Sequence, residues 1–174
     1  MRSTPAWVRT PADLSRYGGP LLLDTHIWVW RLKGETDRVT GDLMPLLDRS
    51  SSEGGVWVLD ISYWEVAMKS AKGQLSFSVD PSVWLKRARE APDIRPLRLD
   101  PDILLVSTRL AGTAHSDPAD RMLIAAAQLN SLPLVTVDRR IIDYAKANPG
   151  TPVVDARRRG RTARRVTGLT ARVH

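Results

Sequence analysis

The sequence contains no cysteine among its 174 residues. A disulfide framework, a thiolate metal site and a cysteine nucleophile are therefore excluded. Because this composition fits a reducing compartment, we expect a cytoplasmic protein. No apolar run approaches the roughly 18–20 residues that a membrane-spanning helix requires, so no membrane association is expected. Residues 1–19 are polar and interrupted by proline, and they lack the apolar stretch of a secretory signal.

Histidine is also scarce, with only His26, His115 and His174 in the chain. So few imidazoles, together with the absence of thiolates, disfavour a zinc site. The hydrophobic share of 43% and the charged share of 26% are those of an ordinary globular protein. The length fits one domain with a substantial core and some additional chain.

Acidic residues are absent from the last 18 residues, and this segment carries the whole net charge of +7. The preceding residues, 1–156, contain equal numbers of basic and acidic side chains. We therefore expect a neutral body followed by a flexible basic tail, residues 156–174. Such tails often contact polyanions, but a solvated terminus is an equally good interpretation. The possible RNA contacts are Arg157, Arg158, Arg159, Arg161, Arg164 and Arg165.

Short apolar segments of strand length alternate with helical patterns along the rest of the chain. Helices are expected at residues 26–34, 40–50, 62–72, 80–91, 101–110, 120–130 and 139–147. Strands are expected at residues 20–24, 56–61, 94–99, 132–137 and 152–154. In the third helix, Trp64, Ala67, Met68 and Ala71 have the spacing of a core-facing stripe. The alternation predicts an α/β fold with a mainly parallel sheet.

Carboxylates lie where the ends of such strands would bring them together. Asp24 and Asp138 each follow an apolar strand directly, and ligands of open α/β sheets bind at the carboxyl ends of strands. Glu65 and Asp120, near the starts of helices, can face the same edge. Clustered carboxylates raise one another's pKa, and a hard divalent cation relieves this repulsion. Such ions support phosphoryl displacement by water.

Each acid also has a purely structural interpretation. Asp24, Asp117 and Asp138 can cap the helices that follow them. Ser62 and Glu65 have the spacing of a capping box, and Glu65 can pair with Lys69 one helical turn later. No single acid therefore decides between catalysis and helix capping.

Three blocks in combination are more specific. LLLDTHIWVW, ISYWEVAMKSAKGQL and HSDPADRMLIAAAQLNSLPLVTVDRRI resemble the PIN-domain family, and within it the VapC-type toxins of bacterial toxin–antitoxin systems. The resemblance extends from about residue 20 to residue 155. It leaves residues 1–19 as an N-terminal extension that we expect to be loose, with Trp7 docked on the domain.

Carried onto this sequence, the resemblance implies that Asp24, Glu65, Asp120 and Asp138 form the catalytic and metal-binding quartet. Asp117 matches an additional acid near the metal. The hydroxyls of Thr25 and Thr136 would orient the carboxylates or the substrate. His115 could do the same, but the simpler interpretation is that it only ends a loop. Trp28 and Trp30 are expected in the core or a dimer contact rather than as platforms for bases.

The resemblance further implies a three-layer α/β/α domain that binds Mg²⁺ or Mn²⁺ and cleaves RNA endonucleolytically. It implies a toxin that forms a homodimer and is masked by a cognate antitoxin. Two alternatives remain: a nuclease of the same fold acting on structured DNA, and a catalytically silent domain that binds RNA or a partner. Retention of all four acids argues against the silent domain.

Overall fold

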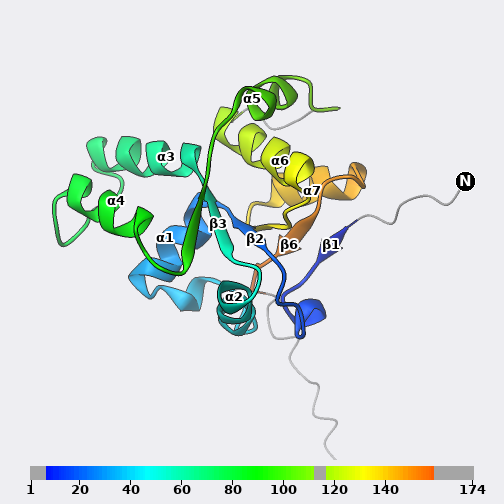
Figure 1. The fold of residues 1–174 in the computed structure, drawn as a ribbon, viewed down its shortest axis with the longest axis horizontal. Helices are drawn as coiled ribbons and strands as arrows, with labels where there is room; N and C mark the ends of the chain where they lie inside the picture. Colours follow the sequence, from blue (N-terminus) through cyan, green and yellow to red (C-terminus); the bar gives the residue numbers. More distant parts are fainter. Residues whose placement is uncertain (1–6, 112–116, 159–174) are drawn as a thin grey trace, which may run out of the picture.

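The computed structural model describes residues 7–111 and 117–158, and it contains one six-stranded parallel sheet (Figure 1). The strand order is β1-β6-β5-β2-β3-β4, and every pair of neighbours runs parallel. The expectation of an α/β fold built on a parallel sheet is confirmed. The strands are β1 (Val8–Arg9), β2 (Leu21–Leu23), β3 (Val56–Leu59), β4 (Ile94–Leu97), β5 (Leu134–Thr136) and β6 (Val153–Asp155).

Helices cover both faces of the sheet and complete three layers (Figure 1). Strand β2 shows the reason, because Leu21 and Leu23 pack into one apolar cluster and Leu22 into the other. Successive side chains of a strand point to opposite faces, so a strand that is apolar throughout requires cover on both sides. The helices are α1 (Thr25–Lys33), α2 (Leu43–Ser52), α3 (Asp60–Ala71), α4 (Pro81–Arg89), α5 (Pro101–Thr108), α6 (Pro118–Asn130) and α7 (Arg139–Ala147).

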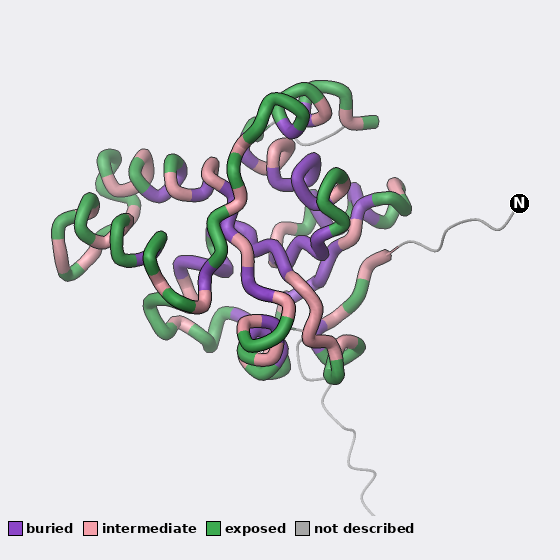
Figure 2. The backbone as a smooth tube through the Cα atoms, viewed as in Figure 1, coloured by how far each residue is buried: buried purple, intermediate pink, exposed green. Residues whose placement is uncertain are grey.

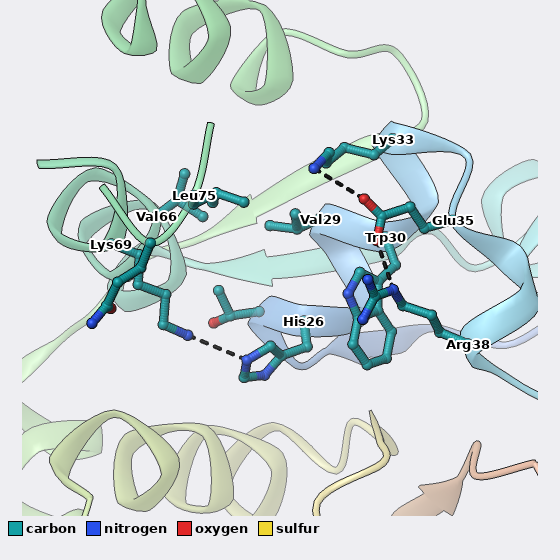
Figure 3. Close-up of a pocket in the computed structure, with 11 residues that line it drawn as sticks. His26, Val29, Trp30, Lys33, Glu35, Arg38, Val66, Lys69 and Leu75 are labelled. Atoms are coloured by element: carbon teal, nitrogen blue, oxygen red, sulfur yellow. Dashed lines mark hydrogen bonds and ion pairs between the residues drawn. The ribbon is translucent and has the colours of Figure 1, made fainter. Parts of the chain in front are cut away.

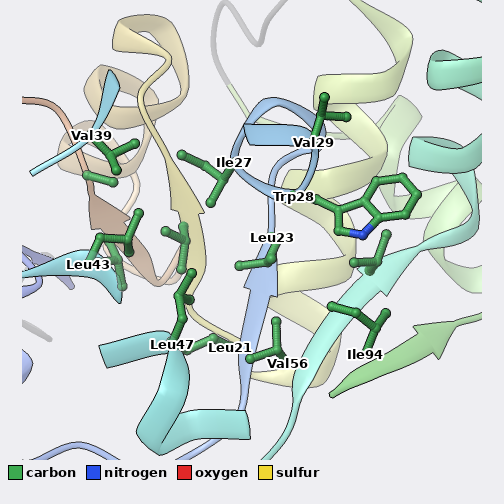
Figure 4. Packing of buried hydrophobic residues seen from close by; sticks show 14 of the residues in the cluster. Leu21, Leu23, Ile27, Trp28, Val29, Val39, Leu43, Leu47, Val56 and Ile94 are labelled. Carbon is green, nitrogen blue, oxygen red and sulfur yellow. The ribbon is translucent and has the colours of Figure 1, made fainter. Parts of the chain in front are cut away.

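The larger cluster joins the sheet to α1 and α2 (Figure 4). Trp28 of α1 is fully buried there, as expected for a core residue. Its ring meets Tyr63 edge-on at 4.7 Å between centroids. Figure 2 shows that the buried residues are concentrated in the sheet and on the helix sides that face it. Helix α1 ends at Gly34, whose φ of 71° is the left-handed conformation that glycine adopts without a Cβ penalty.

Helix α3 differs from the sequence expectation in its start and in its buried face. It begins at Asp60, directly after β3, so Ser62 lies inside the helix and the capping box is wrong. The expected core stripe is also wrong, because Trp64 is 57% exposed, whereas Ser62, Glu65 and Val66 are buried. The side of α3 that faces α1 carries the polar groups of the site described below, and apolar spacing alone could not reveal this.

Residues close to both ends of the described chain add to the domain. Val8 pairs with Val153, so the segment expected as a loose extension contributes the edge strand β1. Trp7 packs against the larger cluster, as expected. Beyond β6, Arg157 forms an isolated bridge with Val39. None of the described helices is both long enough and apolar enough to cross a membrane.

Candidate active site

Asp24 and Asp138 follow the adjacent parallel strands β2 and β5 and therefore lie at the same edge of the sheet. Asp24 is only 3% exposed and accepts a long 3.4 Å hydrogen bond from the His26 amide at the start of α1. Asp138 accepts hydrogen bonds from the amides of Arg140 and Ile141, at 2.6 and 3.3 Å. The capping interpretation is thus confirmed for both acids. Capping does not compete with a site role, because it fixes each carboxylate at the sheet edge.

Thr136 connects these two acids. Its buried hydroxyl donates to the Asp24 carboxylate at 2.6 Å and accepts the Asp138 amide hydrogen bond at 2.9 Å. A hydroxyl has one hydrogen to donate, so this pairing fixes its direction. Thr136 therefore holds one oxygen of Asp24 in place, in agreement with the position that the sequence resemblance gave it.

Glu65 enters from α3 and is 8% exposed. The Thr25 hydroxyl lies 2.5 Å from Glu65 Oε2 and 2.8 Å from the Ser62 hydroxyl. The expected ion pair with Lys69 is present at 3.6 Å. Sequence reasoning treated Ser62 only as a helix cap and missed this contact, although the Ser62-x-x-Glu65 spacing was visible and also places the two side chains on one helix face.

Asp120 and Asp117 enter from the start of α6. Asp117 caps the helix by accepting the Ala119 amide hydrogen bond at 2.8 Å. Burial raises the pKa of the Asp120 carboxyl to about 8, and the negative charges of Asp24, Asp117, Asp138 and Glu65 add to the effect. Asp120 therefore lies within electrostatic reach of every other carboxylate in the expected set. The four acids of the quartet and Asp117 converge from four different elements.

His26 lies beside this acidic cluster and was missing from the expected site list. Its Nδ1 is 3.7 Å from Asp24, and its Nε2 is 3.3 Å from the Lys69 ammonium. Contact with Asp24 raises the pKa of the His26 imidazole. Burial acts to raise the pKa of the Asp24 carboxyl, but the interactions with His26 and Thr136 outweigh it and leave that pKa lowered.

The chemistry of the acidic cluster fits a hard divalent cation. All five side chains offer carboxylate oxygens, which Mg²⁺ and Mn²⁺ prefer, and His26 is the only described imidazole beside them. Burial and the neighbouring negative charges together raise the pKa of Asp120, and a bound cation would offset such crowding of acids. Within residues 7–111 and 117–158, no three acidic or histidine side chains are yet close enough to form a metal-ligand group. Binding an ion would therefore require the side chains to close around it.

Several expected residues fall elsewhere. His115, Arg159, Arg161, Arg164 and Arg165 lie outside the described residues. Arg157 is ion-paired with Asp155 at 2.7 Å, and Arg158 donates to the Asp37 carbonyl at 2.7 Å. Both of these arginines therefore already bind protein groups, and RNA contact by them stays a prediction.

Comparison with known proteins shows the family and the fold. A family model described as PIN domain matches residues 21–147. Ribonuclease VapC22 of Mycobacterium tuberculosis is 25% identical over 131 residues, which cover 75% of this chain and 96% of the relative. A toxin–antitoxin complex from Klebsiella pneumoniae contains a chain that is 20% identical, with a TM-score of 0.51, covering 77% of this chain and 95% of that chain.

A second solved structure has the same fold. It is VapBC2 from Rickettsia felis, bound to a DNA fragment from their promoter, with 14% identity and a TM-score of 0.54. The match covers 77% of this chain and 96% of that chain. The family model spans most of the chain and includes strands β2 to β5, the starts of all seven described helices and the acids of the cluster. This chain belongs to the PIN-domain family.

Proposed function

We propose that this protein is an endoribonuclease that depends on Mg²⁺ or Mn²⁺ and acts through Asp24, Glu65, Asp120 and Asp138. The observation that carries the proposal is the placement of these acids at one edge of the sheet, where the Thr136 hydroxyl joins Asp24 to the Asp138 amide. Burial, together with the charges of the surrounding acids, raises the pKa of Asp120 there to about 8. A protein gains little stability from crowding carboxylates in this way, and such strongly perturbed groups concentrate at functional sites.

Asp24, Glu65, Asp120 and Asp138 would hold the cation, with Asp117 beside them. When bound, a divalent cation lowers the pKa of water and offsets the charge that develops on the phosphate during displacement. Thr136 and Thr25 hold the carboxylates of Asp24 and Glu65 by hydrogen bonds of 2.6 and 2.5 Å, and so restrict their rotation. Such fixed orientation reduces the reorganisation needed when the substrate phosphate arrives.

The choice of RNA as substrate rests on VapC22, which is named as a ribonuclease. The match with this chain covers 96% of the length of VapC22. The role of a toxin rests on the solved structures, which are toxin–antitoxin complexes of the same fold. We infer a cytoplasmic toxin that forms a homodimer and is neutralised by a cognate antitoxin. A reading frame beside this gene that encodes a small DNA-binding protein would support this assignment.

Cleavage by the purified protein tests the proposal. End-labelled single-stranded RNA should be cut internally in Mg²⁺ or Mn²⁺, and EDTA should stop the reaction. Asp24→Asn should lose several orders of magnitude in turnover while its circular dichroism spectrum stays that of the wild type. Cleavage of structured DNA alone would favour the DNA nuclease, and RNA binding without cleavage in any metal would favour the silent domain. Full activity in EDTA would rule out the metal-dependent mechanism.

A further inference from the structure

A pocket of about 530 Å³ opens next to the acidic cluster, between α1 and α3 (Figure 3). Its wall on the α1 side carries His26, Val29 and Trp30, and Lys69 and Val66 face them from α3. Two lining residues contact acids of the cluster directly: His26 contacts Asp24, and Lys69 is paired with Glu65. A strand whose phosphate sits at the acids would therefore place its neighbouring nucleotide here. The other lining residues are Thr25, Lys33, Glu35, Arg38, Gln74 and Leu75.

Trp30 gives the pocket an aromatic wall. It is only partly buried, unlike Trp28, and the Arg38 guanidinium lies 5.4 Å from the centroid of its ring. The His26 ring is 5.8 Å away on the same helix, tilted by 46°. Unpaired RNA bases are recognised by stacking on aromatic rings and on arginine planes, and by hydrogen bonds to their edges. The exposed amide side chain of Gln74 at the rim offers such hydrogen bonds.

The charge of the pocket suits a polyanion. Lys33, Arg38 and Lys69 line it, and Glu35 is the only acid among its lining residues. Glu35 pairs with both Lys33 and Arg38, at 2.9 and 2.7 Å, so it holds these two cations in place but balances only one of them. Lys69 is paired at 3.6 Å with Glu65, outside the pocket lining, so the excess of positive charge comes from the Lys33 and Arg38 side of the pocket. A positive groove with an aromatic wall is the combination by which proteins bind single-stranded nucleic acid.

We propose that this pocket binds the nucleotide next to the scissile phosphate, with its base against Trp30 and Arg38 and its phosphate near Lys69. The inference rests on the proposed ribonuclease function and adds to it a subsite for single-stranded RNA. Trp30 also packs against the larger core cluster, as expected from the sequence, and the proposal adds a role for the part of its ring that lines the pocket. Trp30 and Lys69 are substrate-positioning residues in this account.

Binding of a short single-stranded RNA to the full-length protein tests the subsite without relying on turnover. Affinity is measured by fluorescence anisotropy in Ca²⁺, and RNA integrity is checked on a gel afterwards. Removal of one stacking contact by Trp30→Leu should weaken binding about 5-fold to 150-fold, and Trp30→Phe should recover part of the loss. Trp7→Leu is the matched control, because Trp7 also has an arginine near its ring but lies outside this pocket.

The salt dependence of binding tests the phosphate contact. Lys69→Gln should reduce the slope of log affinity against log salt by about 0.7, the value for one phosphate of a single strand. Lys72→Gln, three residues later on the chain and outside the pocket lining, should leave the slope unchanged. A slope that responds equally to both substitutions would indicate a diffuse charge effect and contradict the proposed phosphate contact.

Photocrosslinking keeps the test decisive if Trp30→Leu folds poorly. An RNA with 4-thiouridine beside the cleavage site should crosslink wild-type protein within residues 26–38 or 66–75. Crosslinks confined to other segments would overturn the proposal. A Trp30→Leu variant that binds RNA as tightly as the wild type would overturn it too. If Trp30→Leu lost only the binding of an antitoxin, the occupant would be a protein segment. Failure of the wild type to bind or cleave any RNA would instead refute the proposed function itself.

Discussion

Replacing Asp120 by asparagine should stabilise the metal-free protein at neutral pH. The change removes a carboxyl whose pKa is raised from 3.8 to about 8 by burial and by the other acids of the cluster. Below pH 3.8 the carboxyl is protonated in both the folded and the unfolded state, so it does not lower the free energy of unfolding. Between these two values the unfolded state releases the proton while the folded state retains it, and stability falls as pH rises. Asparagine does not titrate and avoids that loss.

The size of the effect follows from the same shift. Each pH unit between the two pKa values costs about 1.4 kcal/mol, which gives an upper bound of about 4 kcal/mol at pH 7. Asp120 is only partly buried, and solvent screening reduces such figures considerably, so we expect a gain of about 1–2 kcal/mol. The gain should be largest near pH 8 and should disappear near pH 4.

Urea unfolding in EDTA at pH 4, 7 and 8.5 measures this effect. Asp143→Asn is the control, since Asp143 is ion-paired on the surface with Lys146 at 3.0 Å and its loss should bring no stabilisation at any of these pH values. Mg²⁺ should stabilise the wild type more than Asp120→Asn. A destabilised Asp120→Asn at pH 7, or a gain that persists at pH 4, would refute the reasoning.

Three further predictions concern other parts of the molecule. Thr136→Val removes the hydroxyl that holds Asp24 and should lower RNA turnover about 10- to 100-fold with little change in substrate affinity; equal losses in Thr136→Ser would contradict this role. Trp64→Ser should change the free energy of unfolding by no more than about 0.5 kcal/mol, because the side chain is 57% exposed. A loss of several kcal/mol in chemical denaturation would show that Trp64 faces the core, as the sequence pattern predicted. Deleting residues 159–174 should flatten the salt dependence of RNA binding, and an unchanged slope would leave the tail as a solvated terminus.

Much of the sheet and of the site was predictable because the relevant signals are local. A strand that is apolar throughout, such as residues 21–23, must be covered on both faces, and an acid directly after it lies at the carboxyl edge. Helix α7 was expected at residues 139–147 and is found there, because Asp138 both ends the strand region and caps the helix. The acids and their meeting at one sheet edge could be predicted from sequence, but the hydrogen bonds of Thr25 and Ser62 beside Glu65 required the packing of α1 against α3.

The errors arose where tertiary contacts outweigh local patterns. Strand β1 has two residues, too few for a recognisable alternation, and it exists because β6 offers a free edge. In α3, the apolar spacing that includes Trp64 indicated the wrong face, because the buried side carries Ser62 and Glu65 for the site. The nucleotide pocket could not be read from sequence at all, since Trp30 and Lys69 are brought together only by the packing of α1 beside α3.

The central claim is that the carboxylates that follow β2 and β5, together with those of α3 and α6, act as one cation-binding site. Mn²⁺ binding, followed by electron paramagnetic resonance of the free ion, tests it most directly. Wild-type protein should remove Mn²⁺ from solution in a saturable way and release it to Mg²⁺, and Asp24→Asn and Asp120→Asn should each weaken binding by at least about 10-fold. Undiminished Mn²⁺ binding in both folded variants would contradict the account.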